Sequence, residues 1–360
     1  MKTVLFTLAA VLTLASCAKE DVVREYQAMP EAIAFDNAFI DNATRGRVDN
    51  TLTNTNLNNF RVFGYVTGDA GAYAPIFDNL QVTGSGTGQD AVWTYNDAYT
   101  QYWIAGAKYD FAAIAPFDNA NYPTVTFAKD VNTFKTTLNC VNNGNVDLLY
   151  AQKDPYTAGT SNLKVAFTFK HILSKVNFTF TNAYNAANTV IAVRNIRITN
   201  AYRQAKATLT AGSTVWDTYS DDTLTLNFGD ATDVDPNDEG KFAPKYMSTV
   251  NTQNTNHTEA SYRQLFLIPT TNKAYTVAFD IELYYKNGEN YTLIKKFEHS
   301  KNLTDFNPAA GCSYNITATI ADANIDPTGA QSKIEFTVND TTGVEGWGNA
   351  TDVNIPNTNN

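Results

Sequence analysis

Runs in which apolar and polar residues alternate, with turn residues between them, follow one another along most of this chain. Alternation with a period of two is typical of half-buried β-strands, because successive side chains of a strand point to opposite faces. Three runs stand out in the first half, at Ala32–Ile40, Phe60–Thr67 and Tyr109–Pro116. The second half is more regular and predicts strands at Leu163–Phe169, Lys175–Thr181, Val190–Thr199, Leu224–Phe228, Leu265–Ile268, Tyr275–Tyr285, Tyr291–Phe297, Tyr314–Ile320 and Ile334–Val338.

This pattern predicts an all-β protein, because many short strands joined by turns are typical of β-sandwiches. The dipeptide Asn287-Gly288 lies between two predicted strands and indicates a tight hairpin. The segment 153–162 is rich in turn residues and is the best candidate for a domain boundary. We therefore expect an N-terminal sandwich over residues 48–160 and a C-terminal sandwich over residues 161–360.

Residues 1–16 have the pattern of a secretory signal peptide. Lys2 supplies a positive start, and Val4–Leu14 is an apolar run too short to span a bilayer as a helix. Small residues then precede Cys17, an arrangement that resembles the bacterial lipobox, in which the cysteine receives acyl chains such as palmitate and becomes the mature N-terminus. Two or more acyl chains hold a protein stably on a membrane. An ordinary signal peptide that happens to contain a cysteine is the alternative.

The residues between Cys17 and the second predicted strand form a leader, which we delimit as residues 17–47. Its start, Ala18–Asp21, is similar to the tag that sends some Gram-negative lipoproteins to the outer face of the outer membrane, although a solvated charged tether fits equally. The segment Asp41–Asn59 is almost wholly polar and contains Arg45 and Arg47. Polar segments of this kind are open to proteases.

Composition narrows the range of partners. The formal net charge is −10 and Lys and Arg form no cluster, which argues against nucleic acid as a partner. No second apolar run approaches membrane length.

Besides Cys17, the chain has Cys140 and Cys312, which lie in different halves. An exported compartment permits a disulfide between them, but we expect two separate buried thiols.

The sequence lacks the patterns of common enzymes and metal sites, so we expect no catalysis, cofactor or metal. There is no Gly-x-Ser-x-Gly elbow, no His-Glu-x-x-His, and the histidines are scattered. His171 is interpreted as a structural or capping residue, since a histidine without an organised partner is a poor catalyst. The acidic segment Asp230–Gly240 departs from the calcium-loop pattern and is interpreted mainly as a solvated loop. The Gly-rich turn Thr83–Gly88 precedes no helix pattern that would receive a phosphate.

Exposed aromatic side chains can bind sugar rings, and the tryptophans of this chain are candidates for that role. The chain has four, Trp93, Trp103, Trp216 and Trp347. Large aromatic residues in a sandwich lie more often in the core. We therefore expect core positions for them.

The segment Phe167–Val176, FTFKHILSKV, resembles the F-x-H-x-L-S-K-V pattern that opens the second domain of the fimbrillin-like family, the subunits of type V pili. The likeness extends in the family's order over nearly the whole mature chain. Supporting matches lie at Ile33–Phe35, Thr44-Arg45, Trp93, Tyr102-Trp103, Tyr109–Pro116, Val193–Ile198, Leu267–Pro269, Gly311–Ile320 and Ile334–Phe336 before Trp347.

The resemblance implies two transthyretin-like β-sandwich domains in tandem. It also implies export as an outer-membrane lipoprotein and trimming by an arginine-specific protease at the cell surface, which here would cut after Arg45 or Arg47. Ile33 and Phe35 would fill a groove until the leader is lost. A strand from another fimbrial subunit would then fill that groove, as β-strand addition satisfies both backbone and pockets, and the protein would become part of a fimbrium that supports adhesion.

Two points stay open on the sequence alone. The first is the position of the subunit in the fibre, because the family contains stalk, tip and anchor subunits and a stalk subunit needs a donor strand. The polar, Asn-rich tail 348–360 offers only a weak donor strand, although Ile334–Val338 is another candidate. The alternative function is a permanently anchored surface lipoprotein that binds a glycan or a host protein.

Overall fold

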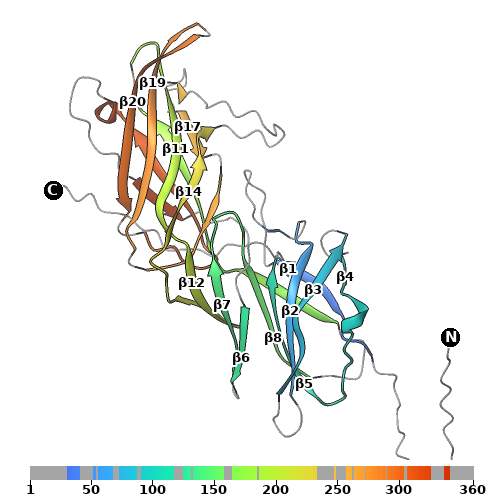
Figure 1. The fold of residues 1–360 in the computed structure, drawn as a ribbon. Coiled ribbons are helices and arrows are strands. Elements are labelled where there is room, and N and C mark those ends of the chain that lie inside the picture. The colour runs from blue at the N-terminus through green and yellow to red at the C-terminus, as the bar shows by residue number, and fades with distance from the viewer. Residues whose placement is uncertain are drawn as a thin grey trace, which may run out of the picture.

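Two β-lobes lie end to end in the molecule (Figure 1). The computed structural model describes residues 31–40, 52–53, 56–67, 73–86, 91–116, 125–130, 133–157, 164–184, 186–232, 247–248, 257–261, 263–271, 273–288, 290–303, 306–325 and 336–340. The predicted all-β fold is confirmed, since the helices among these residues are two short 3-10 turns, Asp97–Tyr99 and Asp322–Asn324. Within the same ranges, no helix has the length and apolar character needed to cross a membrane.

The N-terminal lobe is built on a seven-stranded sheet. Its strand order is β1-β9-β8-β5-β2-β3-β4. The strands are β1 (Phe35–Ile40), β2 (Asn59–Thr67), β3 (Tyr73–Ser85), β4 (Val92–Thr94), β5 (Lys108–Ala115), β8 (Leu149–Thr157) and β9 (Val165–His171). One face of this sheet carries an aromatic core, which we call the N-terminal core and which includes Phe35, Phe60, Phe77, Phe111 and Phe167.

Strand β5 lies between two apolar cores. Phe111 and Ala113 face the N-terminal core, whereas Ala112 and Ile114 belong to a second cluster on the other face. A strand buried on both faces has a nearly continuous apolar sequence instead of alternation. This burial explains why the run Tyr109–Ala115 is almost wholly apolar.

A four-stranded sheet of order β13-β12-β7-β6 supplies the other side of that second cluster. Its strands are β6 (Val125–Asp130), β7 (Thr133–Val141), β12 (Gln204–Thr210) and β13 (Ser213–Asp217). Here β7 pairs with β12, so that Leu138 lies opposite Ala207. Strands β9 and β12 follow the boundary predicted at residue 160 but pair with strands that precede it. The two halves of the chain thus share sheets.

The C-terminal lobe is a sandwich of two sheets around one apolar core. One sheet has the order β15-β17-β10-β21-β22 with β18 paired to β10, and the other has β14-β11-β19-β20 with β16 paired to β11. The bounds are β10 Ser174–Asn182, β11 Thr189–Tyr202, β14 Thr223–Gly229, β15 Ala231–Thr232, β16 Met247–Ser248, β17 His257–Ser261, β18 Leu265–Leu267, β19 Tyr275–Asn287, β20 Asn290–Leu303, β21 Ser313–Ile320 and β22 Phe336–Asp340. The rings of Phe178, Phe180, Phe228, Phe279 and Phe336 meet in this core.

The predicted hairpin at Asn287-Gly288 is present between β19 and β20, where Asn287 lies opposite Asn290. Gly288 has φ +62°, a left-handed conformation that glycine adopts without steric cost. The hairpin strands are long, and β20 ends at Leu303 instead of the predicted Phe297.

Cys140 and Cys312 are both buried free thiols, as expected. Burial raises the pKa of the Cys140 thiol to about 12.

Because the thiolate is the reactive species, we expect Cys140 to resist iodoacetamide at pH 8 in the folded protein and to react after unfolding in guanidinium. Peptide mass spectrometry measures the modified fraction. The variant Val141→Cys in a Cys140→Ser background is the matched control, because Val141 is exposed, and its thiol should react without denaturant. Fast native labelling of Cys140 would contradict the burial argument.

Candidate functional site

The leader segment runs into the N-terminal core and forms part of it. The side chains of Ile33 and Phe35 are 0% and 2% exposed, and Ile40 at the end of β1 is also buried. The sequence predicts that Ile33 and Phe35 fill a groove, and the structure places both among the core side chains. We call the space that residues 31–40 occupy the leader slot.

Backbone hydrogen bonds hold the leader on two sides. On one side β1 runs parallel to β9, with Phe35 opposite Val165, and the Val165 N–H donates to the Ala34 carbonyl at 2.8 Å. On the other side the Ile33 N–H donates to the Gln101 carbonyl at 2.8 Å, and the Trp103 N–H donates to the Glu31 carbonyl at 2.9 Å. Residues 31–40 therefore bridge β9 and the segment 101–103. The sequence does not predict either of these two partners, because alternation does not reveal which strand pairs with residues 31–40.

Phe35 is the main side-chain anchor in the leader slot. Its ring centroid lies 6.3 Å from that of Phe60, 6.5 Å from Phe111 and 6.0 Å from Phe167. The Tyr95 ring packs against Phe35 at 5.7 Å, and its hydroxyl donates to the Ile33 carbonyl at 2.5 Å. Aromatic pairs at these separations contribute beyond their buried area.

Burial of the leader is energetically substantial. Full burial of a large apolar side chain stabilises a fold by about 1.5–3 kcal/mol. Ile33, Phe35 and Ile40 are all buried, so the three together contribute about 5–9 kcal/mol on that scale. Loss of the leader would expose their pockets and leave unpaired those backbone groups of β9 and of residues 101–103 that pair with the leader.

A buried histidine–carboxylate pair fixes the end of β9 beside the segment that follows the leader. The His171 Nδ1 lies 2.9 Å from the Asp147 Oδ1, and both side chains are inaccessible to solvent. The other carboxylate oxygen accepts a 2.9 Å hydrogen bond from the Leu52 N–H. Full burial makes His171 structural, as its interpretation from the sequence has it, although that interpretation assumed no organised partner and the structure supplies Asp147. Nothing in the sequence pattern singles out Asp147, because it lies before β8 and its partner lies at the end of β9, far along the chain.

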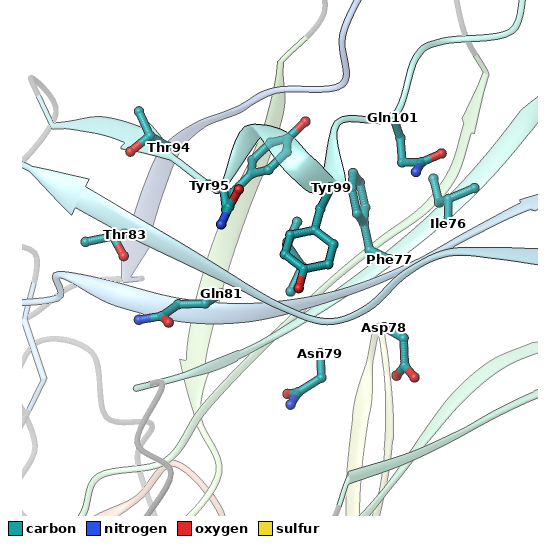
Figure 2. A pocket seen from close by; sticks show the side chains of 12 residues that line it. Ile76, Phe77, Asp78, Asn79, Gln81, Thr83, Thr94, Tyr95, Tyr99 and Gln101 are labelled. Carbon is teal, nitrogen blue, oxygen red and sulfur yellow. The ribbon is translucent and has the colours of Figure 1, made fainter.

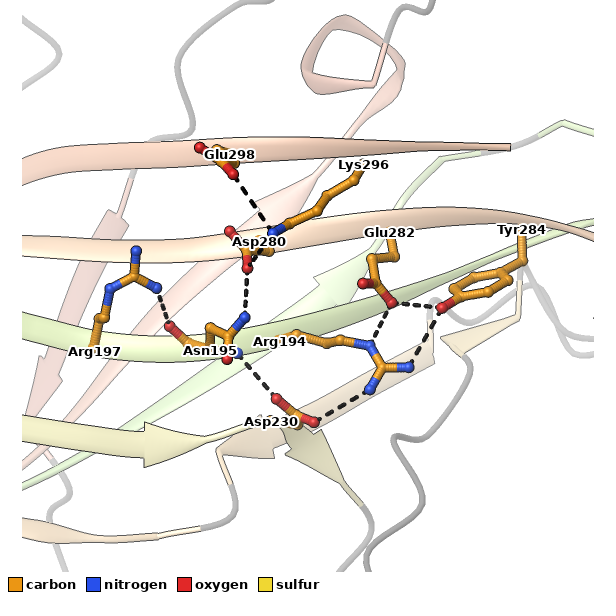
Figure 3. A network of polar contacts seen from close by, with 9 residues as sticks. All are labelled: Arg194, Asn195, Arg197, Asp230, Asp280, Glu282, Tyr284, Lys296 and Glu298. Carbon is orange, nitrogen blue, oxygen red and sulfur yellow. Dashed lines mark hydrogen bonds and ion pairs between the residues drawn. The ribbon is translucent and has the colours of Figure 1, made fainter. Parts of the chain in front are cut away.

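A second polar cluster joins β11, β19 and Asp230 in the C-terminal lobe (Figure 3). Strand β11 is bulged between Arg194 and Arg197, and Asn195 has φ 54°. The freed Asn195 N–H donates to the Asp230 carboxylate at 3.0 Å. Arg194 lies between Asp230 and Glu282 and forms an ion pair with each. The first residue of the acidic segment Asp230–Gly240 is therefore engaged with protein groups.

Several predicted sites lie outside the described residues. These are the lipid-attachment residue Cys17, the cleavage candidates Arg45 and Arg47, residues 233–240 of the acidic segment, and Trp347. Among the residues that are described, no group of three or more His, Cys, Asp or Glu side chains is placed to hold a metal ion.

The three described tryptophans are parts of the framework. Trp93 is buried, whereas Trp103 and Trp216 are partly buried against apolar clusters. The Trp216 Nε1–H donates to the Ile172 carbonyl at 2.9 Å. The expectation of core positions is therefore confirmed for Trp93, whereas Trp103 and Trp216 lie at the edge of the cores and are only partly buried.

The C-terminal strand β22 pairs with β21 in its own sandwich. The pairing is antiparallel, with Val338 opposite Ile316. Phe336 is buried and packs against Phe178 and Phe180. The predicted strand Ile334–Val338 thus corresponds to a strand that contributes to the C-terminal core, and its described part begins at Phe336.

These features define a protein of two β-sandwich lobes in which the N-terminal segment supplies a core strand. A profile of the fimbrillin-like family matches residues 44–341, and the chain belongs to this family. It is accordingly a fimbrial protein of the cell surface. A search of curated proteins found no match.

Comparison with a solved fimbrial protein supports the fold. A fimbrial protein from Bacteroides vulgatus superposes with a TM-score of 0.56 at 18% identity, over 86% of this chain and 99% of that one. A protein from Bacteroides ovatus, described as a cell adhesion candidate, gives a TM-score of 0.47 at 14% identity, over 86% of this chain and 97% of that one.

Proposed function

We propose that this chain is a subunit that joins a surface fimbria by donor-strand exchange after loss of its leader. In this scheme the protein is exported as a lipoprotein acylated at Cys17 and reaches the outer membrane. An arginine-specific protease then cuts after Arg45 or Arg47. The observation that carries the proposal is the burial of Ile33 and Phe35 in the leader slot.

The position of the arginines makes the leader separable. The polar segment with Arg45 and Arg47 follows β1 directly. A cut there leaves residues 31–40 attached only by hydrogen bonds and apolar contacts. Until the cut, the covalently attached leader occupies the slot and prevents another strand from entering.

An emptied leader slot would favour a strand of similar pattern. The exposed edge of β9 would present unpaired backbone groups beside the pockets of Ile33, Phe35 and Ile40. Such edges bind extended chains through main-chain hydrogen bonds, with alternate side chains in the pockets. A strand from another copy, or from a related subunit, meets these requirements.

Whether this subunit also donates a strand decides its position along the fibre. A stalk subunit must give a strand as well as accept one. Strand β22 would have to leave its pairing with β21 and withdraw Phe336 from the C-terminal core in order to serve. If it stays in place, only the weak donor 348–360 is left, and a subunit that accepts a strand without giving one suits a tip or accessory role.

The test is controlled proteolysis of the purified chain from Ala18 onward. We expect an arginine-specific protease to give a new N-terminus at Gly46 or Val48, followed by high-mass ladders on native gels. The double variant Arg45→Lys/Arg47→Lys should remain uncut at this segment and monomeric. The Arg24→Lys variant is the matched control and should be cut and assemble as the parent does.

Two results would contradict the proposal. One is a chain that loses residues 31–40 after cleavage and still remains monomeric. The other is surface protein from the native cell that always begins at acylated Cys17 and never forms ladders, which would favour the permanently anchored lipoprotein.

A further inference from the structure

An open cleft lies on the N-terminal lobe between β3 and the segment 94–101 (Figure 2). Its volume is about 570 Å³, within the range of about 300–1,000 Å³ that is usual for small-molecule sites. Residues of β3 line one side, and Thr94, Tyr95, Tyr99 and Gln101 line the other. The cleft shares Tyr95 and Gln101 with the leader slot, but ligand binding in it is not a step of the strand exchange proposed above, so an inference drawn from it goes beyond that function.

A β-bulge in β3 builds one wall of the cleft. Val62 lies opposite Leu80, whereas Gly64 lies opposite Phe77, so that β3 has one extra residue between these pairs. Asn79 in the bulge has φ 55°. Because the bulge interrupts the alternation of faces, all residues from 76 to 81 line the cleft.

The other wall presents an exposed aromatic ring on a fixed support. Tyr99 is 60% exposed and ends the 3-10 helix Asp97–Tyr99. Asn96 caps this helix, because its side chain accepts a 2.9 Å hydrogen bond from the Ala98 N–H. Tyr95 is anchored by its hydroxyl bond to Ile33 and packs against Phe77, with ring centroids 5.7 Å apart.

The polar groups of the cleft are suited to neutral hydroxyls. The side chains of Asn79, Gln81 and Gln101 make no hydrogen bond to other described residues, so their amides are available both as donors and as acceptors. Among the described residues that line the cleft, Asp78 carries the one formal charge, and none is Lys, Arg or His. A ligand with a carboxylate, sulfate or phosphate would meet no cation on these walls and would be repelled by Asp78.

We propose that this cleft binds a neutral saccharide of one or two pyranose residues. The Tyr99 ring stacks on the apolar C–H face of a sugar ring, since aromatic side chains combine apolar contact area with a defined geometry. The amides of Asn79, Gln81 and Gln101 exchange hydrogen bonds with the sugar hydroxyls. The bulge and the capped helix hold both walls in place before the ligand arrives, which limits the entropic cost of binding.

The test uses the intact chain from Ala18 onward on an array of neutral and sialylated oligosaccharides. Titration calorimetry then follows with lactose, maltose and N,N′-diacetylchitobiose. We expect binding to neutral glycans only. Tyr99→Ala should weaken binding about tenfold or more, whereas Tyr99→Phe should retain most of the affinity because the stacking surface is kept. Gln81→Ala should weaken binding severalfold through the loss of a hydrogen bond.

Tyr102→Ala is the matched control, because Tyr102 is 51% exposed and nearby but does not line the cleft. Its affinity should equal that of the parent. Thermal unfolding by circular dichroism checks that each variant is folded. The proposal is wrong if no neutral glycan binds, if sialylated glycans bind best, or if a folded Tyr99→Ala protein binds as the parent does.

Discussion

Phe35→Ala is expected to destabilise the N-terminal lobe by about 3–5 kcal/mol, the usual cost of removing a buried phenylalanine ring. The ring lies among Phe60, Phe111 and Phe167 and is almost inaccessible to solvent. These neighbours belong to β2, β5 and β9 and cannot all move into the space that the substitution creates. Much of the cavity would therefore remain and add to the lost burial.

Guanidinium unfolding followed by tryptophan fluorescence measures this effect, because Trp93 packs against Phe60 in the same core, with ring centroids 4.9 Å apart. Asp36→Ala is the matched control on the adjacent residue. Its ion pair with Lys164, at 3.4 Å, is partly exposed, and such pairs contribute about 0–1 kcal/mol. A Phe35→Ala protein as stable as the Asp36→Ala protein would show that the leader slot contributes little, and the strand-exchange proposal would lose its physical basis.

Asp147→Ala is the second substitution with a large expected effect, about 2–6 kcal/mol, because it removes the hydrogen-bond partner of two groups, and each buried group left unsatisfied costs about 1–3 kcal/mol. It would leave His171 buried without the carboxylate that its Nδ1 contacts. It would also remove the acceptor of the Leu52 N–H. Both lost contacts lie where the end of β9 meets Leu52, which follows the predicted cleavage sites in the chain.

The same unfolding experiment serves here, with Asp222→Ala as the control. Asp222 forms a 2.8 Å ion pair with Arg203, but both side chains are largely exposed, so its loss should cost about 0–1 kcal/mol. The loss of stability in the Asp147→Asn protein should lie between those of the Asp147→Ala and Asp222→Ala proteins, since the Asn amide oxygen still accepts one hydrogen bond. Equal stability of the Asp147→Ala and Asp222→Ala proteins would rule out a structural role for the buried pair.

The tryptophans show why residue type alone does not locate a ligand-binding surface. They are the sugar-binding candidates that the sequence offers, yet Trp93 is buried and Trp216 donates to the backbone. The exposed ring at the cleft belongs to Tyr99, and its partners come from β3. A bulge and a short 3-10 helix bring these groups together, and neither leaves a periodic signal in the sequence.

Strand prediction fails where side chains are small or polar. Strand β12, Gln204–Thr210, buries only Ala205, Ala207 and Leu209, so its alternation has little hydrophobic contrast. The predicted boundary assigns β9 to the C-terminal sandwich, but this strand joins the seven-stranded sheet beside β1 and β8. Sequence neighbours usually pair, whereas the parallel contact of β1 with β9 joins residues that lie far apart in the chain.

Local sequence pattern was sufficient for the all-β class, for twelve of the 22 described strands, for the Asn287-Gly288 hairpin and for the shared strand face of Ile33 and Phe35. Each of these depends on alternation or on the conformational freedom of a single residue. Three-dimensional packing was needed to show that the leader lies between β9 and residues 101–103, that Asp147 meets His171, and that Tyr99 faces a polar cleft. Those arrangements depend on strand order and on bulges, because alternation shows which face of a strand is buried but not which strand lies beside it.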